Sequence, residues 1–155
     1  MAAASQILGW VQQIFDQKGI HYKLFEKDYV IKTNFPLKCK LKDIDVIYIF
    51  KEDSFGVYAT IALSADKDCR QKVAEYITRA NYGIRYGNFE MDFDDGDIRY
   101  HLNVDCTDRI SLSEKMVMRT ICIPMQMFDR YGDGLVAVMF GIKSPEDAIK
   151  EAEND

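Results

Sequence analysis

The stretch Gly87-Asn-Phe-Glu-Met-Asp-Phe-Asp-Asp-Gly-Asp-Ile-Arg-Tyr-His-Leu-Asn-Val-Asp-Cys106 predicts a β-hairpin around which the other elements can be placed. Its Asp95-Gly96 dipeptide tolerates the positive φ angles that a two-residue type I′ turn requires. A slip of one residue would move every apolar side chain to the other face, so turn chemistry and burial together predict one register. The predicted pairs are Phe93 with Ile98, Asp92 with Arg99, Met91 with Tyr100, Glu90 with His101 and Phe89 with Leu102.

The composition is that of one globular domain. The chain has 155 residues, of which 48% are hydrophobic and 29% charged, which is enough to bury a sizeable core. We expect a single domain over residues 1–155 with an ordered core over about 5–152. The net charge is −5, and the acidic excess lies in residues 67–155. A surface of that sign repels phosphates and anionic lipids, so we expect neither a nucleic-acid nor a membrane partner.

The four cysteines form no Cys-x-x-Cys pair, and the chain has only two histidines. This is not a zinc framework, so we expect reduced thiols in or near the core and no metal or other cofactor. The start, Met-Ala-Ala-Ala-Ser-Gln, lacks the basic and apolar regions of a signal peptide. These features predict a cytoplasmic location. The cysteines are Cys39, Cys69, Cys106 and Cys122.

Apolar residues at helical spacing predict three shorter helices. The first covers residues 5–18 and is stopped by Gly19. The second has its buried face between residues 69 and 80, with Asp66 or Asp68 as its cap. The last runs from the Ser144-Pro145 cap to about residue 152.

A longer helix is predicted to begin at the capping-box spacing Ser111-Leu-Ser-Glu114 and to run towards Tyr131. Pro124 lies inside it, and we expect a kink or break there because proline removes a backbone donor. Gly132 and Gly134 then predict an interruption before a separate apolar segment over residues 135–140.

Short runs of β-branched and aromatic residues predict strands over residues 29–35, 45–51 and 55–63, with a short extended piece at 21–25. Both alternating sets of the second and third strands are apolar, whereas a sheet with one solvated face needs only one. Either helices cover both faces or a second subunit covers one. The small number of helices favours a partner chain, with Ile47 and Ile49 as candidate contact residues.

Three motifs carry a resemblance to a known family. They are Asn81 with the Gly87-to-Tyr100 hairpin, the Asp129-Arg-Tyr131 segment, and Gly141-Ile-Lys-Ser-Pro-Glu-Asp-Ala-Ile149. Together with the element order they resemble the YbjN family of bacterial sensory-transduction regulators, whose fold is that of the type III secretion chaperones.

The resemblance implies a single α+β domain in α-β-β-β-α-β-β-α order, with an antiparallel sheet and helices mainly on one face. It also implies a dimer that regulates signalling or binds another protein as a chaperone does. The family brings no catalytic residues to this chain, so we expect no enzyme.

Two acidic segments are candidate calcium sites because Ca²⁺ prefers carboxylate ligands. In the hairpin turn, Asp92 at position one puts Gly96 at the fifth position instead of the sixth. In the segment that starts at Asp129, Tyr131 and Phe140 occupy ligand positions. Both fail the EF-hand spacing, and we expect solvated carboxylates instead.

Two further groups are weaker site candidates. Lys38, Lys40 and Lys42 alternate along the chain and, as a strand, would form a basic edge that either binds an anionic partner or prevents strand pairing. The second reading is favoured. His101 opposite Glu90 resembles an acid–base pair, but no nucleophile is tied to it by spacing, so an exposed strand histidine is the preferred reading.

Five of the seven methionines fall in the long predicted helix and its continuation. One reading is a helix buried in the core; the other is a methionine surface that meets a second subunit or a client, because thioethers adapt to irregular apolar partners. We predict a non-enzymatic protein-binding module with a regulatory or chaperone-like role, acting as a homodimer with an unidentified protein partner. The alternative is a small-ligand-binding or enzymatic domain with a site near residues 90–101. The candidate binding residues are Met116, Met118, Met125, Met127, Ile47 and Ile49.

Overall fold

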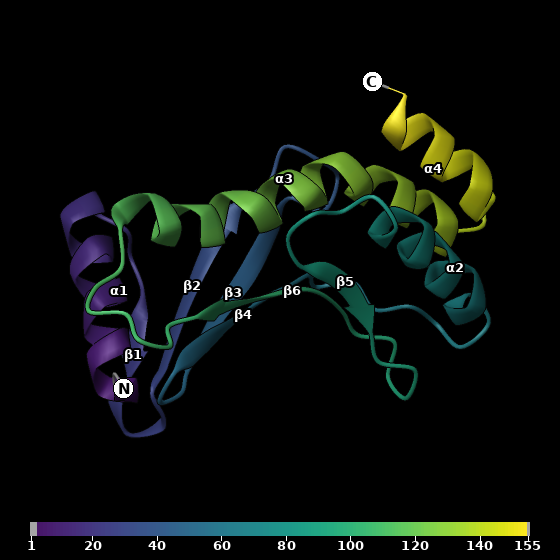
Figure 1. Cartoon of the computed structure of the whole chain (residues 1–155). Coiled ribbons are helices and arrows are strands. Elements are labelled where there is room, and N and C mark those ends of the chain that lie inside the picture. The colour runs from purple at the N-terminus through teal and green to yellow at the C-terminus, as the bar shows by residue number, and fades with distance from the viewer. Residues whose placement is uncertain (1–2, 155) are drawn as a thin grey trace.

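The computed structural model describes residues 3–154; residues 1, 2 and 155 of the predicted domain lie outside them. Six antiparallel strands form one sheet in the order β1-β2-β3-β4-β6-β5 (Figure 1). The elements are α1 (Ala4–Lys18), β1 (Lys23–Phe25), the 3-10 helix η1 (Glu26–Asp28), β2 (Val30–Pro36), β3 (Asp43–Phe50), β4 (Ser54–Thr60), α2 (Arg70–Asn81), β5 (Asn88–Met91), β6 (Ile98–Asp105), α3 (Glu114–Met139) and α4 (Pro145–Glu153).

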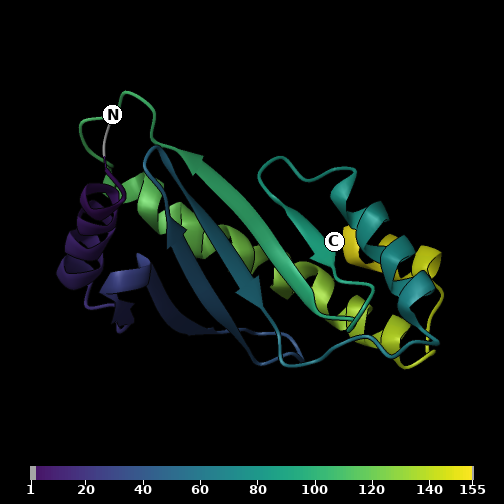
Figure 2. The same cartoon turned by 90° about the horizontal axis from the view of Figure 1, so that it is seen from below.

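Alternation along β3 decides which face of the sheet the helices cover. Ile44, Val46, Tyr48 and Phe50 are buried, whereas the intervening side chains are partly or fully exposed. Phe15 of α1 meets the Tyr48 ring edge-on at a centroid distance of 5.4 Å. Figure 2 shows the molecule from below, with the central strands in front of α3 and no helix in front of those strands. The predicted α+β fold with helices mainly on one face is confirmed.

The hairpin has the predicted faces but not the predicted register. Phe89 pairs with Tyr100, not with Leu102, and Met91 pairs with Ile98, a shift of two residues along β6. A shift of two keeps Phe89 and Tyr100 on the buried face, because side chains alternate with a period of two. The connection is therefore longer than a two-residue turn and spans residues 92–97, with Phe93 51% exposed.

Side chains within the turn and a neighbouring loop stabilise this longer connection. The carboxylates of Asp92 and Asp95 each accept a hydrogen bond from the backbone N–H two residues on, both at 2.8 Å. The Gly96 carbonyl accepts the Ala65 N–H at 2.8 Å. Arg70 donates from Nε to the Ala65 carbonyl and from Nη1 to the Phe93 carbonyl, both at 2.9 Å. The turn is thus attached to the segment before α2.

No break occurs in the long helix, so a break at Pro124 and the predicted interruption at Gly132 and Gly134 are wrong. α3 is one helix of 26 residues that continues through Pro124, Gly132 and Gly134 (Figure 1). Pro124 is buried, and the apolar face continues on both sides of it. Burial of that face outweighs the lost hydrogen bond, which costs about 3 kcal/mol in a helix interior.

The two glycines of α3 are positions of close packing. A Cβ atom on Gly132 would lie 2.8 Å from Cys39 Sγ and from Leu41 Cδ1. A Cβ atom on Gly134 would overlap the Tyr76 hydroxyl of α2. Glycine at these positions lets a loop and a helix approach α3 closely. The two glycines therefore serve packing and do not end the helix.

The helix caps agree with the predictions in part. Ser144 Oγ accepts the Asp147 N–H at 3.1 Å, which confirms the cap of α4. The cap of α3 is Ser113, whose Oγ accepts the Met116 N–H at 3.2 Å, and not Ser111. α2 starts after Cys69 with no side-chain cap, so the predicted caps Asp66 and Asp68 are wrong.

The three lysines around residue 40 lie in the loop between β2 and β3, and not on a strand edge. Asp129 Oδ1 on α3 accepts the backbone N–H groups of Lys38 and Cys39 at 2.6 and 3.2 Å. Asp133 Oδ1 accepts the N–H of Lys40 at 2.8 Å. These bonds hold the loop against one flank of α3.

Replacing Asp129 by alanine is expected to lower the free energy of unfolding by about 1 kcal/mol, less than is usual for bonds to a charged acceptor because the site is partly solvated. It should also speed tryptic cleavage at Lys38. Urea unfolding and limited proteolysis check both effects, with Asp68→Ala as the exposed control. Unchanged stability and cleavage would contradict this role of Asp129.

Candidate protein-binding surfaces

The uncovered sheet face is the first candidate surface. Ile47 lies between Lys32 of β2 and Tyr58 of β4, and Ile49 lies between Val30 and Gly56. Ile47 is partly buried and Ile49 is 36% exposed. The structure thus brings the two predicted contact residues of β3 to one face. They form a short apolar strip in a face that is otherwise largely polar.

A ring stack and an ion-pair network extend this face towards the hairpin. The Tyr58 and His101 rings stack at a centroid distance of 4.5 Å, and the Arg99 guanidinium lies 4.7 Å from the Tyr58 centroid. Glu90 Oε1 is 2.9 Å from His101 Nδ1, and Glu90 Oε2 accepts a 2.6 Å bond from Arg99 Nε. Partial burial alone would raise the pKa of Glu90, but the bonds from His101 and Arg99 outweigh it and lower that pKa.

This network joins β4, β5 and β6. It lies near residues 90–101, where the alternative prediction placed an enzymatic or ligand-binding site. Within residues 3–154, no serine, threonine or cysteine side chain is hydrogen-bonded to His101. The predicted proximity of Glu90 and His101 is present through a diagonal contact, because Asn88 is the residue directly opposite His101. The arrangement holds a cross-strand ion pair and brings no nucleophile to it.

The methionines of α3 lie on two flanks of the helix, and all four candidates are partly buried against the core. Met118 and Met125 share the flank of Asp129, which holds the loop after β2. Met116 and Met127 share the opposite flank with Ile123, towards residues 83–87. The methionines therefore do not form one continuous face.

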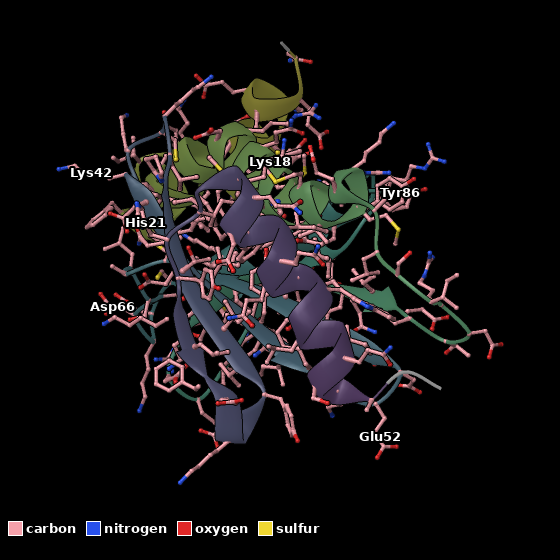
Figure 3. All side chains as sticks on the ribbon, turned by 90° about the vertical axis from the view of Figure 1, so that its left-hand side faces the viewer. Lys18, His21, Lys42, Glu52, Asp66 and Tyr86 are labelled. Atoms are coloured by element: carbon pink, nitrogen blue, oxygen red, sulfur yellow. The ribbon has the colours of Figure 1, made fainter. Side chains whose placement is uncertain are left out.

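A groove runs along the Met116 and Met127 flank of α3, between that helix, β6 and residues 83–87. One part, of about 370 Å³, lies beside residues 102–105 of β6. A second part, of about 410 Å³, reaches Arg130 and Tyr131. The two parts share Arg85, Tyr86, Arg119 and Ile123 among their lining residues, so they lie next to each other along α3, and together they are called the groove. Figure 3 shows Tyr86 on the opposite side of the molecule from Lys42.

Arginines dominate the charge of this groove. The Arg119 and Arg85 guanidinium groups lie 4.5 and 5.2 Å from the Tyr86 ring centroid. A hydrogen bond from Arg119, reinforced by the Arg85 charge, lowers the pKa of Tyr86. Sequence reasoning missed this groove because its arginines are far apart along the chain; the Arg85-Tyr86-Gly87 tripeptide was the available signal.

The acidic segments do not form a metal site in the described structure. Among residues 3–154, no group of three or more His, Cys, Asp and Glu side chains is placed to hold a metal ion. Asp129 and Asp133 accept backbone N–H groups, and the hydroxyl of Tyr131 donates to Glu153 Oε1 at 3.0 Å.

The cysteines are free thiols in the structure. Burial raises the pKa values of Cys39 and Cys106, so neither is activated as a thiolate. Cys122 is exposed, contrary to the expectation that all four lie in or near the core.

Comparison with solved structures finds a similar fold in a chain of the crystal structure of the ExsC–ExsE complex. The match has a TM-score of 0.52 at 10% sequence identity and covers 84% of this chain and 96% of the other. This confirms the predicted architecture; at this identity the similarity concerns the fold alone.

The other comparisons return nothing that places the chain in a family. No protein-family model matches the sequence, and no curated protein matches it. The YbjN resemblance therefore stays a prediction. Among residues 3–154, no helix is both long and apolar enough to cross a membrane.

Proposed function

We propose that this chain is a non-enzymatic protein-binding module with a chaperone-like, regulatory role in the cytoplasm. The observation that carries the proposal is the fold similarity to a chain of the ExsC–ExsE complex, which is itself an assembly of two proteins. The YbjN resemblance of the hairpin and of the C-terminal segment supports the same role. The network around His101 supplies no nucleophile, so the enzymatic alternative has no observation in its favour.

The module acts as a homodimer through the uncovered sheet face. A hollow of about 640 Å³ lies there, lined in part by Lys32, Asp45 and Ile47. A two-fold contact uses one patch on both subunits, so Lys32 of one copy can approach Asp45 of the other. The same contact would bury the remaining exposed surface of Ile47 and Ile49. Because Ile49 is 36% exposed, it would gain only about a third of the ~1.5–3 kcal/mol that burying a fully exposed isoleucine is worth.

Light scattering after gel filtration is expected to give twice the chain mass of 17.9 kDa. Ile49→Lys should give the mass of one chain, because an unpaired charge in an apolar contact costs several kcal/mol. Ile142→Lys is the matched control, since Ile142 is 71% exposed and lies away from the sheet, and it should remain dimeric. A wild-type monomer at tens of micromolar, or a dimer of Ile49→Lys, would refute this dimer.

A further inference from the structure

β6 has a free edge for half of its length. It has eight residues, but its neighbour β5 has four, and their pairing ends at Asn88 opposite His101. Gly87 has a φ of +76°, and a Cβ atom there would lie 2.5 Å from the His101 carbonyl oxygen. At this glycine the chain diverges from β6, so none of the described strands lies beside residues 102–105 on that side (Figure 2).

Hydrogen bonds at the two ends of β6 show which backbone groups face this edge. The Cys106 N–H donates to the Asp53 carbonyl on the β4 side, whereas the Asp97 carbonyl accepts the Asp92 N–H on the β5 side. Backbone groups of an antiparallel strand point alternately to its two neighbours. The N–H and C=O of Asn103 therefore point to the free edge, as does the Asp105 N–H. The Asp105 carbonyl accepts Arg109 Nε at 2.9 Å.

The free edge opens into the groove beside α3. The buried side of the edge presents Leu102 and Val104, and the α3 wall presents Met116 and Ile123. Extended peptides recognise such edges through main-chain hydrogen bonds, while side chains at alternate positions enter the adjoining pocket. An incoming strand would thus place every second side chain against these apolar residues.

The arginines of the groove indicate that its occupant is acidic. Four line it, namely Arg85, Arg109, Arg119 and Arg130, and Asp105 is its only carboxylate among the lining residues. Within residues 3–154, none of the four forms an ion pair with a carboxylate. Unpaired arginines on a chain of net charge −5 favour a partner that supplies the carboxylates.

We propose that an extended acidic segment of a partner protein binds this groove as an added strand, paired with the backbone of Asn103 and flanked by the arginines. The proposal rests on the protein-binding function above and specifies where the partner binds and with what chemistry. A protein segment is favoured over a nucleic acid because the edge offers main-chain pairing and the net charge of the chain is negative.

The test is fluorescence anisotropy with a labelled octapeptide that alternates glutamate and valine. We expect saturable binding, and binding at least about tenfold weaker when lysine replaces glutamate, because charge complementarity is lost. Asn103→Pro removes the edge N–H without touching the β4 ladder and should weaken binding by about tenfold, the equivalent of a hydrogen bond of about 1.4 kcal/mol. Asn103→Thr keeps the N–H and should bind as the wild type does.

Arg119→Glu provides a second variant that leaves the β6 backbone unchanged. It should weaken binding by about tenfold, whereas Lys72→Glu on α2, with the same change of charge, should have little effect. Equal binding by Asn103→Pro and wild type, no saturable peptide binding, or tighter binding of an eight-nucleotide oligothymidylate would overturn the proposal. Light scattering tests the homodimer independently of the peptide site at the β6 edge. A protein that is dimeric but does not bind the peptide would refute only the β6 site.

Discussion

Replacing Gly96 by alanine is expected to lower the free energy of unfolding by about 3 kcal/mol, combining left-handed backbone strain with overpacking. Gly96 has a φ of +78°, and a Cβ atom would overlap the backbone carbonyl of Ala65. Ala65 is 1% exposed and donates its N–H to the Gly96 carbonyl, so the obstacle is fixed backbone. Relief would require the turn to separate from the loop before α2.

Gly141→Ala is the matched control for this effect. Its φ of +68° imposes similar strain, but a Cβ atom there would have no neighbour within 4 Å. Its loss should be about 1 kcal/mol, from strain alone. Urea unfolding followed by circular dichroism measures both variants. Equal losses would show that the turn does not depend on its contact with Ala65.

Replacing Gly134 by alanine is expected to destabilise the chain by about 2 kcal/mol even though alanine is the better helix former by about 1 kcal/mol. The added methyl group would displace the Tyr76 ring, which is 1% exposed. The Tyr76 hydroxyl donates a 2.6 Å hydrogen bond to the Tyr131 carbonyl, and displacement would leave a buried polar group without its partner.

Gly9→Ala in α1 measures the stabilisation from helix propensity alone. Gly9 also lies inside a helix, but a Cβ atom there would have open space around it. This variant should gain up to about 1 kcal/mol. The opposite signs of the two glycine-to-alanine changes, measured in the same unfolding experiment, are the expected result. A stabilised Gly134→Ala would mean that Tyr76 moves without cost.

The hairpin shows how far local pattern determines a fold. Alternation placed Phe89 and Tyr100 on the buried face, because a period of two depends only on neighbouring residues. The predicted register differs from the observed one by two residues because Asp95-Gly96 has the sequence of a two-residue turn. In the structure Gly96 packs against Ala65, which is far away in the chain. A contact with a residue outside the hairpin cannot be predicted from the hairpin sequence.

The long helix and the groove show the same limit. Pro124, Gly132 and Gly134 predicted interruptions by local rules, yet Leu41 and Tyr76 need the space that the glycines leave. The arginines of the groove come from a loop, a turn and α3, so only the fold brings them together. By contrast, Ile47 and Ile49 share one face, as alternation alone required.

The short outer strands have a consequence for the solubility of the sheet. β1 has three residues and β5 has four, and short margins offer little template for stacking copies of the same chain into fibres. Residues 102–105 of β6 and residues 33–36 of β2 extend beyond these short outer strands. Arg85, Arg109 and Arg119 surround the free half of β6. Two such edges brought together would repel each other through like charges. The arginines that would attract an acidic segment therefore also oppose aggregation through this edge.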